Sequence, residues 1–113
     1  MTDTPSAEWL SLPDVAEALD LKVTRVHRLI EDRALLARRI DGTLRVPAAF
    51  LGEGEPLREL RGTIIVLGDA GFHDDEIMDW LLSPEESLGT TPIDALRAGR
   101  KTEVRRVAQA LAF

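Results

Sequence analysis

Five polar side chains at positions 22 to 28 have the chemistry of a nucleic-acid contact: Lys22, Thr24, Arg25, His27 and Arg28. A helix over residues 23–33, at about 100° per residue, directs Thr24, Arg25 and Arg28 away from its apolar stripe. His27 then lies at the edge of that face, and Lys22 lies at the start of the helix. Arginine fits the O6 and N7 atoms of guanine, whereas lysine and threonine suit phosphates. We expect Arg25 and Arg28 to contact bases, and Lys22 and Thr24 to contact the backbone. The alternative is an ordinary solvated helix face.

A second basic set, Arg38, Arg39 and Arg45, lies on a predicted β-hairpin over residues 37–47. The Asp41-Gly42 dipeptide between two β-prone runs predicts a type I′ turn, which needs positive φ at both central residues. This turn places Arg38 opposite Arg45 and directs Arg39 to the other face. Like charges in that position destabilise a sheet, so a phosphate that bridges them would explain the pair. The alternative is that both stems cover apolar surface while their charged ends stay in water.

The charge of the chain is segregated. Its 113 residues carry 14 Lys and Arg against 20 Asp and Glu, a formal net charge of −6, which is unusual for a protein that binds a polyanion. Residues 22–45 nevertheless hold seven basic and three acidic residues, a net charge of +4, and the rest of the chain carries −10. Because local charge defines a binding footprint, this favours a DNA-binding face. Glu31 and Asp32 would repel phosphate and confine the contact to the first two helical turns.

The elements that position these residues follow the order helix, turn, helix, hairpin. Val15, Ala16 and Leu19 predict a helix that begins near Leu12, and an apolar stripe from Val23 to Ile30 predicts the next. This order is typical of a winged helix–turn–helix. We therefore predict a mainly α fold with a flexible arm over 1–10, a winged helix–turn–helix over 11–51 with a two-stranded wing, and a C-terminal helical bundle over 57–113 packed on it.

The C-terminal region contains two further clusters of charged residues. A basic cluster could contact DNA flanks or a protein partner, although a solvated helix face is the simpler interpretation; it comprises Arg97, Arg100, Lys101, Arg105 and Arg106. The His73-Asp74-Asp75-Glu76 run resembles a metal cluster in composition only, and its expected role is to cap a helix.

Several function classes find no support. Cysteine is absent and only two histidines are present, so disulfides and thiolate metal sites are excluded, and a zinc site would need added carboxylates. The sequence has no Gly-rich phosphate loop, nucleophile elbow or Ser/His/Asp spacing, and we expect neither enzymatic activity nor a cofactor. No apolar run approaches the ~20 residues that span a bilayer, and residues 1–6 lack signal-peptide features. The cytoplasm is the expected location.

The stretches Leu12–Leu19 and Val23–Val26 resemble the excisionase and MerR-type winged helix–turn–helix. Together with Asp75–Leu81, Pro92–Leu96 and Glu103–Ala110, they resemble a family of small actinobacterial winged helix–turn–helix DNA-binding proteins, one of which is a substrate of a membrane Ser/Thr kinase. The resemblance covers the chain from about Leu12 to Phe113. It implies DNA binding, a small wing and C-terminal helices of undefined role.

The chain departs from the motif at two positions. Lys22 stands where a Ser or Thr cap is common, and Asp20 stands where Gly is usual. The resemblance also makes a Ser/Thr kinase a candidate partner. Thr2, Thr4 and Ser6 are the candidate phosphorylation sites, and added negative charge near a DNA-binding face should weaken binding.

We therefore predict a DNA-binding protein that reads duplex DNA with helix 23–33 in the major groove and wing 37–47 on the backbone, and that regulates transcription. Its C-terminal helices would support the winged unit or mediate self-association. Two alternatives remain open. Residues 89–99 resemble the partner-binding segment of certain helix–turn–helix antitoxins, and the winged motif alone is also typical of an excisionase-type recombination factor.

Overall fold

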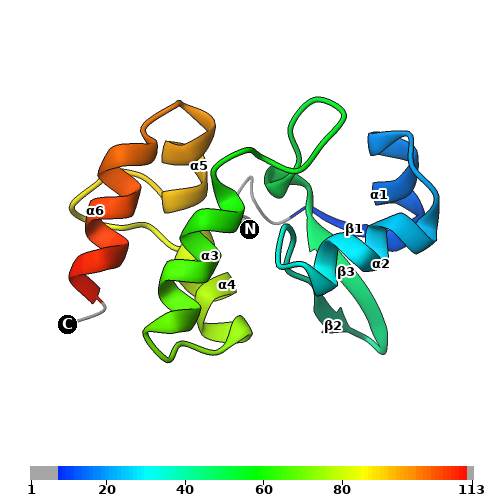
Figure 1. Cartoon of the computed structure of the whole chain (residues 1–113), viewed down its shortest axis with the longest axis horizontal. Coiled ribbons are helices and arrows are strands. Elements are labelled where there is room, and N and C mark those ends of the chain that lie inside the picture. Colours follow the sequence, from blue (N-terminus) through cyan, green and yellow to red (C-terminus); the bar gives the residue numbers. More distant parts are fainter. Residues whose placement is uncertain (1–7, 112–113) are drawn as a thin grey trace. The chain divides into compact units, whose positions relative to one another are not determined.

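The computed structural model describes residues 8–111, and the chain divides into two compact units, residues 1–56 and 57–113. The N-terminal unit consists of β1 (Trp9–Ser11), α1 (Leu12–Leu19), α2 (Val23–Glu31), β2 (Arg38–Ile40), β3 (Thr43–Pro47) and the short 3₁₀ helix η2 (Ala48–Phe50). The C-terminal unit consists of α3 (Leu60–Asp69), α4 (Asp74–Leu82), α5 (Pro92–Arg97) and α6 (Lys101–Leu111) (Figure 1). The predicted mainly α fold with a winged helix–turn–helix is confirmed.

The N-terminal sheet is antiparallel with strand order β1-β3-β2. The predicted hairpin register is confirmed, with Arg38 opposite Arg45 and Arg39 opposite Leu44. Asp41 and Gly42 have φ values of 53° and 81°, as a type I′ turn requires. Aspartate tolerates positive φ nearly as well as asparagine, and glycine has no Cβ to oppose it. Asp41 and Gly42 can therefore form the turn that joins β2 to β3.

The sheet has one strand more than the two-stranded wing that we predicted. Trp9 and Leu10, placed in the flexible arm, belong to β1, which pairs with β3 through Trp9–Pro47 and Leu10–Val46. The pairing satisfies the backbone of β3 on its second edge. Residues 1–7 of the expected arm lie outside the described residues. The expected start of the winged unit at residue 11 is therefore too late by at least two residues.

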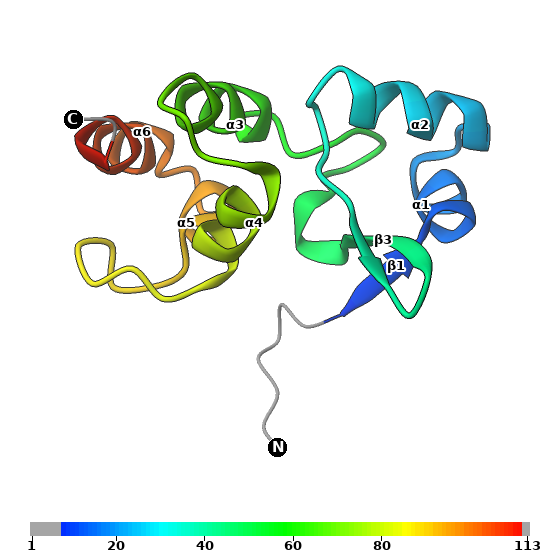
Figure 2. The ribbon, with the colours of Figure 1, turned by 90° about the horizontal axis from the view of Figure 1, so that it is seen from below.

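Helix α1 begins where its sequence signals place it. The Oγ of Ser11 accepts a hydrogen bond from the Asp14 amide at 3.2 Å, and Pro13 occupies the first turn, where no intrahelical donor is needed. Helix α1 contacts α2 and the sheet (Figure 2). The apolar side chains gathered there form the core of this unit: Leu12, Val15, Ala16, Leu19, Val26, Leu35, Leu36, Val46 and Phe50.

Helix α2 ends at Glu31, two residues before the predicted end at residue 33. Asp32 leaves helical geometry, and Arg33 adopts the left-handed conformation with φ of 63°. The reversal leads the chain into Leu35 and Leu36, which are both buried. The sequence carries no Gly or Asn at this position to mark such an end.

Asp20 ends α1 in the left-handed conformation, with φ of 57° and ψ of 48°, and its amide donates to the carbonyls of Ala16 and Glu17. A Cβ is disfavoured in this conformation, and glycine removes that penalty. We expect Asp20→Gly to raise the free energy of unfolding by about 0.5–1 kcal/mol in urea denaturation. Asp20→Ala, which keeps the Cβ but loses the polar side chain, should be less stable than wild type. A glycine variant less stable than wild type would contradict this account.

The C-terminal unit is built from four helices within the described residues, and α6 lies alongside α3 (Figure 2). Thr91 caps α5 by accepting from the Asp94 amide at 3.2 Å, as the Thr91-Pro92 sequence predicts. At α4, the His73 amide donates to Glu76 Oε1 at 2.8 Å. The His73–Glu76 run therefore serves the start of a helix. The core of the unit includes Leu60, Ile64, Leu67, Ile77, Met78, Leu81, Ile93, Val104 and Ala108.

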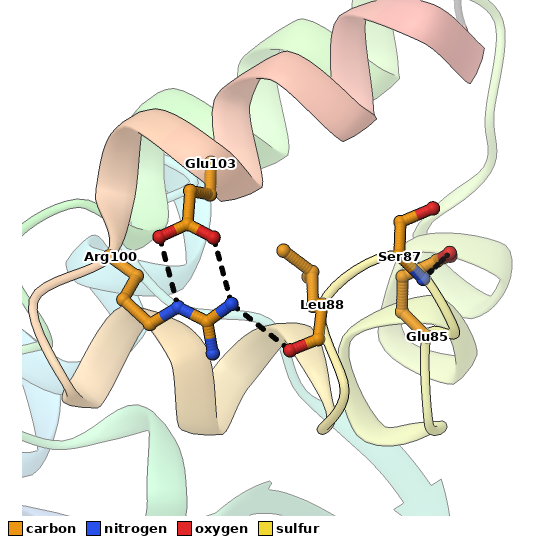
Figure 3. A network of polar contacts seen from close by, with 5 residues as sticks. All are labelled: Glu85, Ser87, Leu88, Arg100 and Glu103. Carbon is orange, nitrogen blue, oxygen red and sulfur yellow. Dashed lines mark hydrogen bonds and ion pairs between the residues drawn. The ribbon is translucent and has the colours of Figure 1, made fainter.

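Arg100 connects the start of α6 to the loop before α5. Its Nε and Nη2 donate to Glu103 at 3.1 and 2.8 Å, and Nη2 also donates to the Leu88 carbonyl at 3.0 Å (Figure 3). The hydrogen bonds with Glu103 raise the pKa of Arg100, and those with Arg100 lower the pKa of Glu103. This arginine of the basic cluster therefore has a structural role.

Among residues 8–111, no helix has the length and apolar character needed to cross a membrane.

Candidate nucleic-acid interface

One face of α2 presents the side chains that the sequence singled out. Thr24, Arg25, His27 and Arg28 are exposed on the helix, and Lys22 is exposed at its N-cap. On the opposite side, Val26 is fully buried at 0% exposure, and Leu29 and Ile30 are half-buried. This apolar anchor orients the helix, so that the basic side chains must project outward.

The N-terminus of α2 has no side-chain cap. Lys22 has extended backbone geometry, φ −77° and ψ 152°, and its side chain accepts no bond from the first turn. A lysine cannot accept as a Ser or Thr cap would. The N-terminus of α2 therefore presents two positive features to an approaching anion, namely the positive end of the helix dipole and the ammonium group of Lys22.

The C-terminal end of the same helix is acidic. Glu31 and Asp32 are both exposed, as the sequence indicates. Their charge repels phosphate, so the geometry supports contact through the first turns, where Thr24, Arg25 and Arg28 lie.

The wing places arginine at the centre of the small sheet. Arg45 on β3 faces Ser11 on one side and Arg38 on the other. The guanidinium carbon of Arg38 lies 5.9 Å from the centre of the Trp9 ring, within the range of a cation–π contact. Arg38 therefore lies against an aromatic surface. For this side chain, the contact supports the alternative that its stem covers apolar surface while its charged end stays in water.

Arg39 occupies the other face of the hairpin and is exposed. Its Nη1 donates to the Gly42 carbonyl at 3.0 Å. This bond fixes the guanidinium at the turn while leaving its other donors for solvent or phosphate.

Sequence reasoning missed Trp9 as part of this region. Its ring position depends on β1, a strand of only three residues, which is too short for alternation to be recognised. In the C-terminal unit, the segment that resembles antitoxin partner-binding sequences directs its apolar residues inward. Pro92, Ile93, Ala95 and Leu96 are all buried.

Comparisons with known proteins divide the chain near residue 56, as the two compact units of the structure do. Residues 3–51 match the family model described as DNA-binding protein Rv2175c, wHTH domain, and residues 57–112 match the Rv2175c C-terminal domain of unknown function. The chain is 35% identical over 122 residues to the DNA-binding protein Rv2175c of Mycobacterium tuberculosis, covering 96% of this chain and 84% of that protein. The NMR structure of Rv2175c superposes with a TM-score of 0.86 at 33% identity, covering 100% of this chain and 86% of that one.

Proposed function

Because this chain belongs to the family of the DNA-binding protein Rv2175c, we propose that it binds duplex DNA through α2 and the β2–β3 wing. The family predicted from the sequence is confirmed. The observation that carries the proposal is the basic, exposed face of α2 opposite the buried Val26. In a winged helix–turn–helix, a helix presented in this way enters the major groove.

The individual contacts follow from side-chain chemistry and position. Arg25 and Arg28 project from the helix surface and suit guanine edges. Lys22 and Thr24 suit the adjacent phosphates, with His27 at the margin of the contact. On the wing, Arg39 and Arg45 would contact the backbone, and Arg38 would add charge while it rests on Trp9.

In this proposal the chain is a transcriptional regulator and not an enzyme, and it acts in the cytoplasm, where bacterial DNA lies. Base contacts from two arginines of α2 would supply the sequence preference that a regulator needs. The C-terminal helices would provide self-association on paired half-sites.

A Ser/Thr kinase is the proposed regulator of binding. The candidate hydroxyls of Thr2, Thr4 and Ser6 lie outside the described residues and precede β1 in the sequence. Strand β1 pairs with β3, which carries Arg45. A phosphate added to this segment would add about −1.5 to −2 charges to the protein and should weaken its attraction for DNA.

Titration of labelled duplex at two salt concentrations tests the central proposal. The duplex would first be selected by the protein from a random pool. With three to five cations on phosphates, log Kobs should fall with log salt with a slope of about −3 to −5. A palindromic selected sequence would support a dimer. Absence of salt-sensitive binding at low salt would refute the proposal.

A further inference from the structure

The C-terminal unit contains a cationic surface cavity beside α6. Its volume is about 450 Å³, and its lining residues are Glu59, Lys101, Thr102, Arg105, Arg106 and Gln109. Three of these carry positive charge, one carries negative charge, and the remaining two offer neutral hydrogen-bonding groups. Among residues 8–111, no apolar side chain lines the cavity, so it suits an anion better than an apolar anchor of a peptide.

The backbone of α3 makes room for one of these cations. A Cβ at Gly62 would overlap Nη2 of Arg105 and would lie 3.3 Å from its Cζ. Glycine weakens the helix that contains it relative to alanine. At this position it allows the Arg105 guanidinium to lie directly on α3, beside the cavity.

Lys101 and Arg105 can still donate hydrogen bonds to a ligand in the cavity. Lys101 Nζ lies 3.5 Å and Arg105 Nη2 lies 3.8 Å from the Glu59 carboxylate, beyond the usual length of a charge-assisted hydrogen bond. Within residues 8–111, the buried Nε of Arg105 has no acceptor. Arg100, in contrast, uses Nε and Nη2 in three hydrogen bonds (Figure 3).

The sequence distribution of charge agrees with a second binding surface. Residues 97–106 hold five basic residues and one acidic residue, a net charge of +4 in a chain of −6. This equals the net charge of residues 22–45, so each unit contains one strongly basic run.

We propose that this cavity, formed by Lys101, Arg105 and Arg106, binds a phosphate of the duplex backbone and gives the C-terminal unit a sequence-independent DNA contact. The proposal rests on the proposed function of the N-terminal unit. A duplex is the favoured occupant because it presents phosphates without requiring apolar pockets, and because α2 would already hold one on the same chain. Phosphate contacts add affinity and salt dependence but carry no sequence information.

The full-length double variant Lys101→Gln/Arg106→Gln tests the proposal by the salt dependence of DNA binding. The variant removes two of the three cations that would hold this phosphate, and it should reduce the change in affinity between 50 and 200 mM salt by about 3.5-fold. The ratio of affinities for selected and unrelated duplex should stay at the wild-type value. Arg61→Gln removes one exposed charge from the same unit outside the cavity and should leave the salt dependence unchanged.

Gly62→Ala tests the same site without changing its charge. The new methyl group displaces the Arg105 guanidinium, and the affinity change between 50 and 200 mM salt should fall by up to about 3.5-fold. The urea midpoint should not fall, because alanine favours the helix. A wild-type salt dependence in this variant would exclude Arg105 as a phosphate ligand.

The outcomes separate the two proposals. If wild type shows no salt-sensitive duplex binding, the proposed function itself fails. If wild type binds and the Lys101→Gln/Arg106→Gln variant retains the wild-type slope, only the second contact fails, and an acidic protein surface becomes the better candidate for the cavity.

Discussion

Replacement of Arg25 and Arg28 together by alanine is expected to remove most of the preference of this protein for its selected duplex. Each bidentate arginine–guanine contact contributes about 1–3 kcal/mol of discrimination, so the double variant should lose about 2–6 kcal/mol. Binding to unrelated DNA should fall much less, because the phosphate contacts that we propose for the wing and for Lys22 would remain. The measurement is the ratio of affinities for selected and scrambled duplex at one fixed salt concentration.

The matched control replaces two arginines of the wing, Arg39→Ala/Arg45→Ala. This variant should weaken binding to both duplexes alike and reduce the magnitude of the salt slope by about 2, with the affinity ratio preserved. Arg25 and Arg28 are exposed, so their loss should change the free energy of unfolding by less than about 0.5 kcal/mol. If the Arg25→Ala/Arg28→Ala variant keeps the wild-type ratio of affinities for selected and scrambled duplex, α2 is not the element that recognises the base sequence.

The wing shows what local sequence can determine. Asp41-Gly42 fixes the turn type, and the turn type fixes the register, so the Arg38–Arg45 pairing followed from the sequence alone. The start of α5 was predictable for the same reason, since Thr91 and Pro92 act within one helical turn.

Features that depend on distant residues were not predictable. Strand β1 has only three residues and shows no period of its own; it forms because β3 offers an edge. The position of Arg38 on the Trp9 ring therefore had no local signal. The packing of Arg105 against Gly62 joins two helices that are far apart in the sequence. The only local sign of this contact is a glycine inside a helix, where it is unfavourable.

The end of α2 shows a third kind of difference. The apolar stripe continues to Ile30, and nothing in the sequence after it resembles a helix stop. The chain turns through Arg33, with φ of 63°, because Leu35 and Leu36 enter the core. Tertiary packing here overrides the local preference of arginine for right-handed backbone.

The second large effect is expected from Val26→Asp, because Val26 is the fully buried residue of α2, with 0% exposure. An unpaired carboxylate at this position would cost several kcal/mol, a large part of the stability of a small domain. We expect loss of the dispersed amide NMR signals of residues 8–51 and, with them, of DNA binding.

Val23→Asp introduces the same charge three residues earlier in the same helix. It distinguishes the effect of burying a charge on stability from the effect of the added negative charge on DNA binding. Val23 is 38% exposed and lies in the first turn, where an acidic side chain interacts favourably with the helix dipole by about 0.3–1 kcal/mol. This variant should keep or slightly raise its free energy of unfolding in urea. It should still bind DNA less tightly, since the new charge lies in the first turn of α2 and lowers the positive potential of the proposed contact. Equal destabilisation by the two substitutions would mean that Val26 does not anchor α2, and the outward direction of Arg25 and Arg28 would then lose its physical basis.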